Sequence, residues 1–288
     1  MEDQKAPPVP KPSSTVMVVR PVTEDISNSD FELFMVRRHA KSRFMPDRYV
    51  FPGGRLEEAD AAPQALARLY GFELESSLPV FRDVAGQGAW AAELKLTRPQ
   101  QAGLYIAAFR ELFEEAGVLL AIEEASDQPL DLQADQNQAD RFAALRLAMQ
   151  EGQLDFIGML AQEKLLLDFN SLVYFSHWIT PLTEPYRFDT RFFLAQAPLN
   201  QVAESDHFET TDGLWLTPKT AQARYTAKDF NIAYPTLLHI EWLSRQSSLE
   251  AALAAARLKT IVAAMPDQLP DDENGPAFQL PPDVINVW

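Results

Sequence analysis

Three glutamates lie close together in one largely apolar segment of the sequence. Glu111, Glu114 and Glu115 are spaced i, i+3 and i+4, which places their carboxylates on one face of a helix. Like charges at this spacing destabilise an isolated helix by about 0.2–0.5 kcal/mol per pair. Carboxylate oxygens are also the ligands that hard cations such as Mg²⁺ prefer. The pattern therefore has two interpretations, a solvated acidic face or a metal site.

The residues around this segment favour the metal site. Arg110 precedes the first glutamate, and Gly117 follows the last one by two positions, where a left-handed residue commonly ends a helix. Upstream, Gly53 and Gly54 follow a short apolar run, and paired glycines mark a sharp turn or a close approach to the backbone. We therefore expect a helix over residues 104–117 whose acidic face binds Mg²⁺.

The segment resembles the second half of the Nudix box, G-x5-E-x7-R-E-U-x-E-E-x-G-U, in which U is apolar. Residues 110–118, Arg-Glu-Leu-Phe-Glu-Glu-Ala-Gly-Val, fill every fixed position of R-E-U-x-E-E-x-G-U. Gly54 and Asp60 match the first half, with aspartate where the family usually has glutamate. Residues 61–109 separate the two halves, which is 49 residues where the standard box has seven.

This interruption is similar to that of one branch of the family, the acyl-coenzyme A diphosphatases of the Nudix motif 19 type, whose box is split by a long insert. Other stretches resemble that branch too, so that the resemblance covers roughly residues 15–220. They are Arg37-Arg38-His39 with Arg43-Phe44-Met45-Pro46, Val50-Phe51-Pro52-Gly53-Gly54, and Arg187-Phe188-Asp189-Thr190-Arg191-Phe192-Phe193.

The resemblance implies an α+β Nudix fold, an α/β/α sandwich in which helices flank a mixed β-sheet, with helical insertions. It also implies a nucleoside diphosphate derivative as substrate, with Mg²⁺ or Mn²⁺ bridging its phosphates. In this branch coenzyme A or an acyl-CoA is cut to 3′,5′-ADP and a 4′-phosphopantetheine product. Two alternatives stay open. One is NADH, ADP-ribose or a nucleotide sugar as the substrate, and the other is a catalytically silent nucleotide-sensing module.

The resemblance also assigns roles to the box residues. Glu114 and Glu115 bind the metal ions, and Glu111 either completes the metal shell or takes the proton of the attacking water. Arg110 forms an ion pair with Asp60 and holds the loop against the helix. The chain keeps all three glutamates, whereas a silent module usually loses box carboxylates.

Two glycines and one further acid are expected to complete the site. Gly54 offers its carbonyl oxygen to a metal ion, and Gly53 beside it contacts the substrate. In this family a further acid often comes from the loop before the tryptophan-bearing strand. Glu209, six residues before Trp215, is the first candidate for this acid and Glu204 is the second. Acids exposed in polar loops are common, so the alternative for both is a solvated side chain.

Basic residues cluster in residues 37–48, just before the glycine pair. We expect Arg37, Arg38 and Arg43 to bind substrate phosphates, with Arg37 and Arg43 as the first candidates, because guanidinium groups fit phosphate oxygens. The 3′-phosphate of coenzyme A is among these phosphates. The alternative is a solvated loop. The whole chain has 25 Lys and Arg against 41 Asp and Glu, a net charge of −16. Nucleic acids and anionic membranes are therefore not expected as partners.

The remaining sequence predicts the elements that position these residues. A single domain is expected over residues 14–265, with a disordered arm at 1–13, an insertion at 61–103, an exposed acidic loop at 123–140 and an irregular Pro- and Asp-rich tail at 266–288. Strands are expected at 15–22 and 31–37, which form a hairpin, and at 118–122, 172–179, 191–195 and 214–217. Besides the acidic helix, helices are expected at 61–70, 90–96, 140–150, 155–167, 218–228, 233–246 and 249–264.

Composition excludes several classes of function. The chain has no cysteine, which rules out disulfide scaffolds, thiolate metal sites and cysteine nucleophiles. Apolar residues make up 47% and charged residues 23%, as in ordinary globular proteins. No apolar run approaches the ~18 residues of a membrane helix, and the polar N-terminus lacks the apolar core of a signal peptide. A cytoplasmic protein is expected, and the sequence leaves open whether it forms a homodimer.

Overall fold

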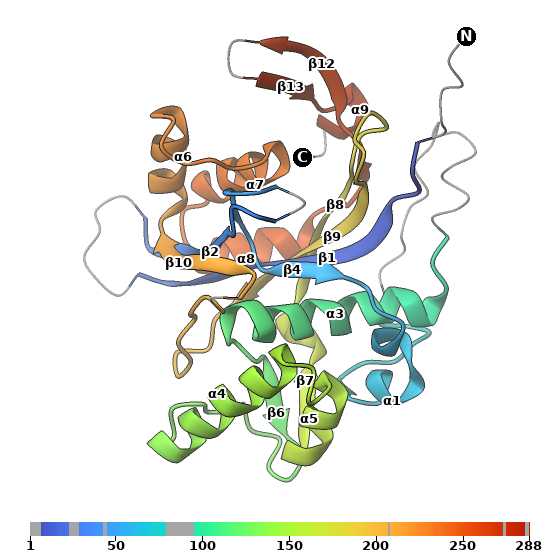
Figure 1. Cartoon of the computed structure of the whole chain (residues 1–288), viewed down its shortest axis with the longest axis vertical. Coiled ribbons are helices and arrows are strands. Elements are labelled where there is room, and N and C mark those ends of the chain that lie inside the picture. Colours follow the sequence, from blue (N-terminus) through green and yellow to red (C-terminus); the bar gives the residue numbers. More distant parts are fainter. Residues whose placement is uncertain are drawn as a thin grey trace.

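The computed structural model describes residues 7–22, 29–42, 45–78, 95–206, 208–272, 275–285 and 288. A mixed sheet lies at the centre of the molecule (Figure 1). Its eight strands are β1 (Lys11–Pro21), β2 (Phe31–Arg38), β3 (Tyr49–Val50), β4 (Gly53–Arg55), β8 (Val173–Ile179), β9 (Phe188–Gln196), β10 (Thr210–Leu216) and β11 (Ala263–Ala264). Six of them follow the order β10–β2–β1–β9–β8–β11, with β3 beside β2 and β4 beside β1.

The strand β1 is buried on both of its faces. It pairs antiparallel with β2, as the sequence predicts, and parallel with β9. Val16 and Val18 pack into the core below the sheet, whereas Met17 and Val19 pack into the core above it. A strand covered on both faces is a continuous apolar run without polar alternation, and the sequence Val-Met-Val-Val has that character.

The first strand begins earlier than expected. Lys11 pairs with Phe188 at the start of β9, so the disordered arm expected over residues 1–13 is wrong for its last three residues. The backbone hydrogen bonds of the parallel pair extend the strand beyond the apolar run that marks its centre. Residues 1–6 lie outside the described part of the chain.

The layer below the sheet contains the acidic helix, and Figure 1 shows it crossing beneath β1 and β4. The helices of this layer are α1 (Pro63–Leu66), α3 (Arg98–Ala116), α4 (Gln136–Gln150) and α5 (Phe156–Glu163). A smaller sheet contains β5 (Leu69–Tyr70), β6 (Ala121–Glu123) and β7 (Leu165–Asp168). Single 3₁₀ turns occur at Ala59–Ala61 and Phe169–Ser171. Together these elements hold the core below the sheet.

The acidic helix α3 begins six residues before the expected position. Thr97 and Gln100 form a capping box, in which each side chain accepts a hydrogen bond from the backbone N–H of the other residue. The helix therefore includes the last six residues of the range 61–103 that was expected for the insertion. The other end agrees with the prediction, because Gly117 has a left-handed φ of 70° and donates its N–H to the carbonyl of Phe113.

Two helices expected around the insertion are shorter in the structure. The one expected over 61–70 is the single turn α1, followed by β5, which pairs with β7. The one expected over 155–167 ends at Glu163, because Lys164 has a left-handed φ of 54° and the next residues form β7. Most of the helix expected over 90–96 lies outside the described residues.

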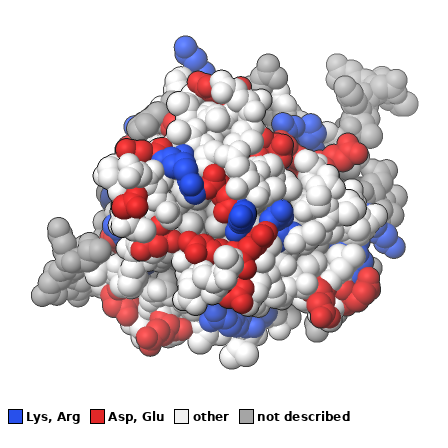
Figure 2. Space-filling view, turned by 90° about the horizontal axis from the view of Figure 1, so that it is seen from below, with Lys and Arg blue, Asp and Glu red and all other residues white. Residues whose placement is uncertain are grey.

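The acidic segment 123–140 is only partly exposed. Leu130 and Leu132 are buried in the lower core, and α4 begins inside the segment at Gln136, where Asp135 caps it. Figure 2 shows the molecule from below, where acidic side chains cross the face in a broken band with basic side chains among them. This distribution is consistent with a net charge of −16 that is spread over the surface.

The layer above the sheet contains three helices from the C-terminal part of the chain. They are α6 (Pro218–Thr226), α7 (Tyr234–Ser244) and α8 (Leu249–Leu258). The helix α8 is shorter than expected, because residues 263–264 pair with β8 as β11. The tail is not irregular as expected, since its residues form the hairpin β12 (Asp267–Asp272) and β13 (Gly275–Gln279) and the short helix α9 (Pro282–Ile285). Among the described residues, no helix is both long and apolar enough to cross a bilayer.

The mixed sheet flanked by helices confirms the predicted fold class. Its consequence for the site is geometric. The glycine strand β4 pairs with β1, and α3 packs against both of them. Gly53 and Glu115, which are 62 positions apart in sequence, therefore meet below the sheet.

Candidate active site

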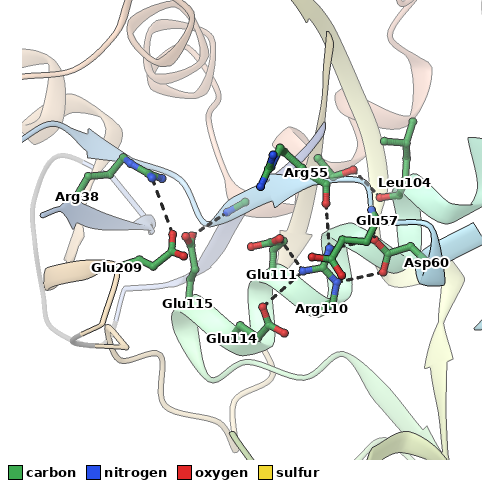
Figure 3. A network of polar contacts seen from close by, with 12 residues as sticks. Arg38, Arg55, Glu57, Asp60, Leu104, Arg110, Glu111, Glu114, Glu115 and Glu209 are labelled. Atoms are coloured by element: carbon green, nitrogen blue, oxygen red, sulfur yellow. Dashed lines mark hydrogen bonds and ion pairs between the residues drawn. The ribbon is translucent and has the colours of Figure 1, made fainter. Parts of the chain in front are cut away.

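The guanidinium of Arg110 is the centre of the acidic site (Figure 3). It donates two hydrogen bonds to the carboxylate of Asp60, from Nε at 3.1 Å and from Nη2 at 3.0 Å. Its Nη1 lies 2.7 Å from Glu111 Oε1 and 3.5 Å from Glu114 Oε2. Both Arg110 and Asp60 are buried. The ion pair that the resemblance implied is thus present, and the shorter aspartate reaches the guanidinium in bidentate geometry.

The same arginine fixes the loop between β4 and α1. Its Nη2 also donates to the carbonyl of Arg55 at 2.9 Å, and the Asp60 carboxylate accepts the backbone N–H of Glu57 at 2.8 Å. Burial alone would lower the pKa of Arg110, but the hydrogen bond to Asp60 and the charges of the acids around it raise this pKa. The guanidinium therefore stays charged and holds the loop against α3.

The glycine strand is fitted closely to the acidic helix. The backbone N–H of Gly53 donates to Glu115 Oε2 at 2.9 Å. A Cβ atom on Gly54 would lie 2.2 Å from Glu111 Oε1, and one on Gly53 would lie 2.3 Å from the carbonyl oxygen of Ser14. Neither position has room for a side chain, so the glycines allow the backbone to reach the carboxylates.

The three box glutamates are less acidic than free carboxyl groups. Burial raises the pKa of Glu111, although Arg110 opposes this shift. Burial and the charge of Glu111 raise the pKa of Glu115 well above its usual value. Burial also raises the pKa of Glu114, to about 7. Such a cluster of desolvated acids favours protons or cations in its neighbourhood.

This shift predicts the pH dependence of the stability of the metal-free protein. Because the pKa of Glu114 is higher in the folded state than the usual 4.5, the folded state binds the proton more tightly. The stability that Glu114 contributes by binding this proton is fully present at low pH and is lost as the pH rises through about 7. Between about pH 5 and pH 8 in EDTA, wild type should therefore lose thermal stability relative to the Glu114→Gln variant.

The comparison of wild type with the Glu114→Gln variant isolates the titration of Glu114. The buried His239, whose pKa burial lowers to about 3, contributes the opposite slope, but equally in both proteins. Thermal unfolding at several pH values measures the difference in midpoint temperature between wild type and variant. A difference that is constant with pH would contradict the assignment.

The acid expected from the loop lies beside the box glutamates. Glu209 comes from the end of the loop before β10, and Figure 3 shows its carboxylate next to that of Glu115. Its charge raises the pKa of Glu111 and Glu115. Its side chain is 68% exposed and lies 3.9 Å from Arg38 Nη2. The second candidate, Glu204, lies near Arg146 instead.

The basic residues of the 37–48 segment divide into two groups. The charge of Arg38 lowers the pKa of Glu115, so its guanidinium is close to the carboxylates. Arg37 instead pairs with Asp47 at 2.7 Å and lies over the ring of Tyr49. Arg43 lies outside the described residues. The structure therefore brings Arg38 to the acidic site and directs Arg37 toward Asp47 and Tyr49.

The carboxylates are the groups that could hold a metal ion. Within the part of the chain that the structure describes, no three His, Cys, Asp or Glu side chains already have their ligand atoms arranged around one point. One oxygen of Glu111 accepts a hydrogen bond from Arg110, and one oxygen of Glu115 accepts a hydrogen bond from the N–H of Gly53. The chemistry of the donor set still fits a hard cation, because three carboxylates with raised pKa lie close together on α3.

The sequence reasoning missed residues that support the site from outside the box. Arg146 and Gln150 on α4 donate to the carbonyl of Glu114 at 2.9 and 3.0 Å. Asp206 accepts the backbone N–H groups of Glu209 and Thr210 at 3.2 and 3.0 Å. An aspartate that is followed by polar loop residues is a signal for such a turn. Nothing in the sequence marks Arg146, which lies in a helix whose buried residues are Phe142 and Met149.

Comparison with known proteins identifies the family. The model of the NUDT19 Nudix domain matches residues 10–243. The acyl-coenzyme A diphosphatase NUDT19 of Xenopus laevis is 26% identical over 236 residues, which cover 75% of this chain and 60% of that protein. The protein of the same name from Gallus gallus is 30% identical over 238 residues, which cover 76% of this chain and 63% of that protein.

A solved structure gives the same result for the fold. The NUDIX hydrolase from Alicyclobacillus acidocaldarius superposes with a TM-score of 0.61 at 25% identity, covering 85% of this chain and 96% of that one. The chain spans about 60–63% of the length of the curated relatives given above. The Nudix fold and the branch that the split box resembles are both confirmed. Since the family model covers more than half of its residues, the chain belongs to the NUDT19 Nudix family.

Proposed function

We propose that this chain is a metal-dependent diphosphatase that hydrolyses the pyrophosphate bond of coenzyme A or an acyl-CoA. The products are 3′,5′-ADP and 4′-phosphopantetheine or its acyl derivative. The observation that carries the proposal is the group of three carboxylates with raised pKa on α3, packed against Gly53 and Gly54. The names of the curated relatives support the choice of substrate.

Glu114 and Glu115, with Glu111 and the carbonyl oxygen of Gly54, would hold Mg²⁺ or Mn²⁺. When bound, the cations neutralise charge on the two phosphates and on the leaving oxygen. The chain itself orients the carboxylates, because Arg110 holds Glu111 and the N–H of Gly53 holds Glu115. The net charge of −16 repels anions at long range. Substrate phosphates therefore depend on bound cations and on basic side chains close to the site.

Arg38 is a second cation, besides Arg110, whose charge reaches the box carboxylates, and it is therefore the first candidate for a phosphate contact. Its only ion-pair partner among the described residues is Glu209, at 3.9 Å, a separation that leaves the guanidinium able to turn toward a phosphate. Glu209 lies next to Glu115 and is more exposed than the box glutamates, so it is the acid that solvent water reaches most easily. We assign it the role of accepting the proton of the attacking water.

A substrate panel tests this function. The protein is incubated with each of five compounds, namely coenzyme A, acetyl-CoA, dephospho-CoA, NADH and ADP-ribose. Mg²⁺ or Mn²⁺ is present, with and without EDTA, and the products are separated by chromatography. We expect coenzyme A and acetyl-CoA to give 3′,5′-ADP, and EDTA to abolish turnover. Dephospho-CoA should have a higher KM, because it lacks the 3′-phosphate that the 37–48 segment would bind.

The panel distinguishes the alternatives. Turnover of NADH or ADP-ribose without turnover of coenzyme A would leave the chemistry in place and overturn the substrate class. Turnover in excess EDTA would overturn the metal requirement. Absence of turnover with every substrate would favour a nucleotide-sensing module, which calorimetric binding of coenzyme A or ADP-ribose would then detect.

A further inference from the structure

The C-terminal end of the acidic helix is held by side chains from α4. The last carbonyl groups of a helix have no partner within the helix and need donors from elsewhere. In α3 the carbonyl of Glu114 accepts from Arg146 Nε at 2.9 Å and from Gln150 Nε2 at 3.0 Å. The guanidinium also lies against the cap, since a Cβ on Gly117 would be 3.0 Å from Arg146 Nη1. A cation at a helix C-terminus is favourable, so Arg146 caps the turn that carries two box glutamates.

The same guanidinium reaches the loop that carries Glu209. Arg146 Nη2 donates to the carbonyl of Glu204 at 3.0 Å. The backbone N–H of Glu204 in turn donates to the carbonyl of Ala116 at 3.0 Å. The charges of Asp206 and Glu204 raise the pKa of Arg146, although burial has the larger effect and lowers it. One side chain thus joins the end of α3 to the loop at Glu204, five residues before Glu209.

Hydrogen bonds within the rest of the loop connect Glu204 to the position of Glu209. The carboxylate of Asp206 accepts backbone N–H groups from Phe208 at 3.1 Å, Glu209 at 3.2 Å and Thr210 at 3.0 Å. On the far side, the carbonyl of Glu209 accepts the N–H of His39 at 3.0 Å. The backbone of Glu209 is therefore hydrogen-bonded on both sides, to Asp206 and to His39. Its distance from α3 depends on where Arg146 holds Glu204.

We propose that Arg146 is a positioning residue that sets the separation between the box carboxylates at the end of α3 and the acid Glu209. It contacts neither substrate nor metal, and it acts through the carbonyls of Glu114 and Glu204. The inference rests on the proposed diphosphatase function, because Glu209 has its role only there. It assigns a task to α4, which lies outside the Nudix box and which no motif marks.

The test compares Arg146→Gln and Arg146→Lys with a matched control on the same helix. Arg141→Gln removes an arginine of α4 whose side chain is 57% exposed and whose partner is Glu163 on α5, away from the site. Each variant is made in the wild-type chain and in a Glu209→Gln chain. Three quantities are measured: kcat and KM for coenzyme A with Mg²⁺, Mn²⁺ affinity by calorimetry without substrate, and the thermal midpoint.

We expect Arg146→Gln to lower kcat and Mn²⁺ affinity each by about tenfold, as for residues that orient metal ligands, with KM nearly unchanged. Arg146→Lys should recover part of the loss, because an ammonium group reaches one carbonyl but does not span both. Arg141→Gln should match wild type in kcat, KM and Mn²⁺ affinity. In the Glu209→Gln chain, Arg146→Gln should have little further effect on kcat, because the acid that it positions is already absent.

Two outcomes would overturn the proposal. One is wild-type kcat and Mn²⁺ affinity in Arg146→Gln. The other is an equal loss of kcat with and without Glu209, which would indicate a general structural role. If the wild-type chain hydrolyses no substrate, the proposed function fails, and the Mn²⁺ affinities of wild type and Arg146→Gln still decide the positioning role. A wild-type chain that binds no Mn²⁺ would overturn both.

Discussion

Replacing Glu114 or Glu115 with glutamine should lower kcat by about 10³-fold, which corresponds to about 4 kcal/mol of transition-state stabilisation at 1.36 kcal/mol per tenfold. A neutral amide keeps the shape of the side chain but cannot neutralise a divalent cation as a carboxylate does. Neither variant should be less stable than wild type without metal, because each removes a carboxylate whose pKa is raised in the folded protein. Steady-state assays with Mg²⁺ and thermal unfolding in EDTA measure the two effects.

The control for this experiment is an acid of the same region outside the site. Glu58 is exposed in the loop that precedes α1, and Glu58→Gln should keep wild-type kcat. Full activity in either the Glu114 or the Glu115 variant would show that the metal is held elsewhere. A lowered thermal midpoint would instead attribute the loss of activity to folding.

Replacing Arg110 with alanine should lower the free energy of unfolding by about 3–5 kcal/mol, because it leaves a buried charge without its partner. Asp60 is 2% exposed and receives two of its hydrogen bonds from this guanidinium. The substitution also removes the hydrogen bond to the carbonyl of Arg55, which ties the loop to α3. Urea unfolding in EDTA measures the change, and the activity of the variant should fall with it.

A double-mutant cycle gives the control. Asp60→Asn combined with Arg110→Ala should cost less than the sum of the two single changes, because the second change no longer leaves a lone charge. Arg245→Ala, at an exposed position after α7, should change stability by less than about 0.5 kcal/mol. Additive costs for Asp60 and Arg110 would contradict the coupling that their geometry indicates.

The parts of the molecule that the sequence predicts are those coded by neighbouring residues. The acidic face of α3, its left-handed end at Gly117 and the hairpin of β1 and β2 all depend on residues close together in the chain. The ion pair of Arg110 with Asp60 was predictable only because both residues lie in a motif with a known partner. The paired glycines indicated a close backbone approach, and Gly54 makes one to Glu111.

The parts that the sequence does not predict depend on distant contacts. Residues 69–70 form a strand because they pair with residues 167–168, and their local pattern favours a helix. The tail forms a hairpin although it is rich in proline and aspartate. Arg146 became relevant only when folding brought α4 to the end of α3. Residue type alone does not tell which of Glu204 and Glu209, or which of Arg37 and Arg38, lies at the acidic site.

The pairing of Arg110 with Asp60 closes a chain loop whose ends are 50 positions apart. Closure entropy grows only with the logarithm of loop length, at about 0.6 kcal/mol per doubling. Lengthening the spacer from seven to 49 residues therefore costs about 1.7 kcal/mol, which is less than the loss expected on breaking the pair. The split in the box is thus thermodynamically inexpensive, because the two halves are fastened directly to each other. The length of the inserted segment is free to change while the geometry of the carboxylates stays the same.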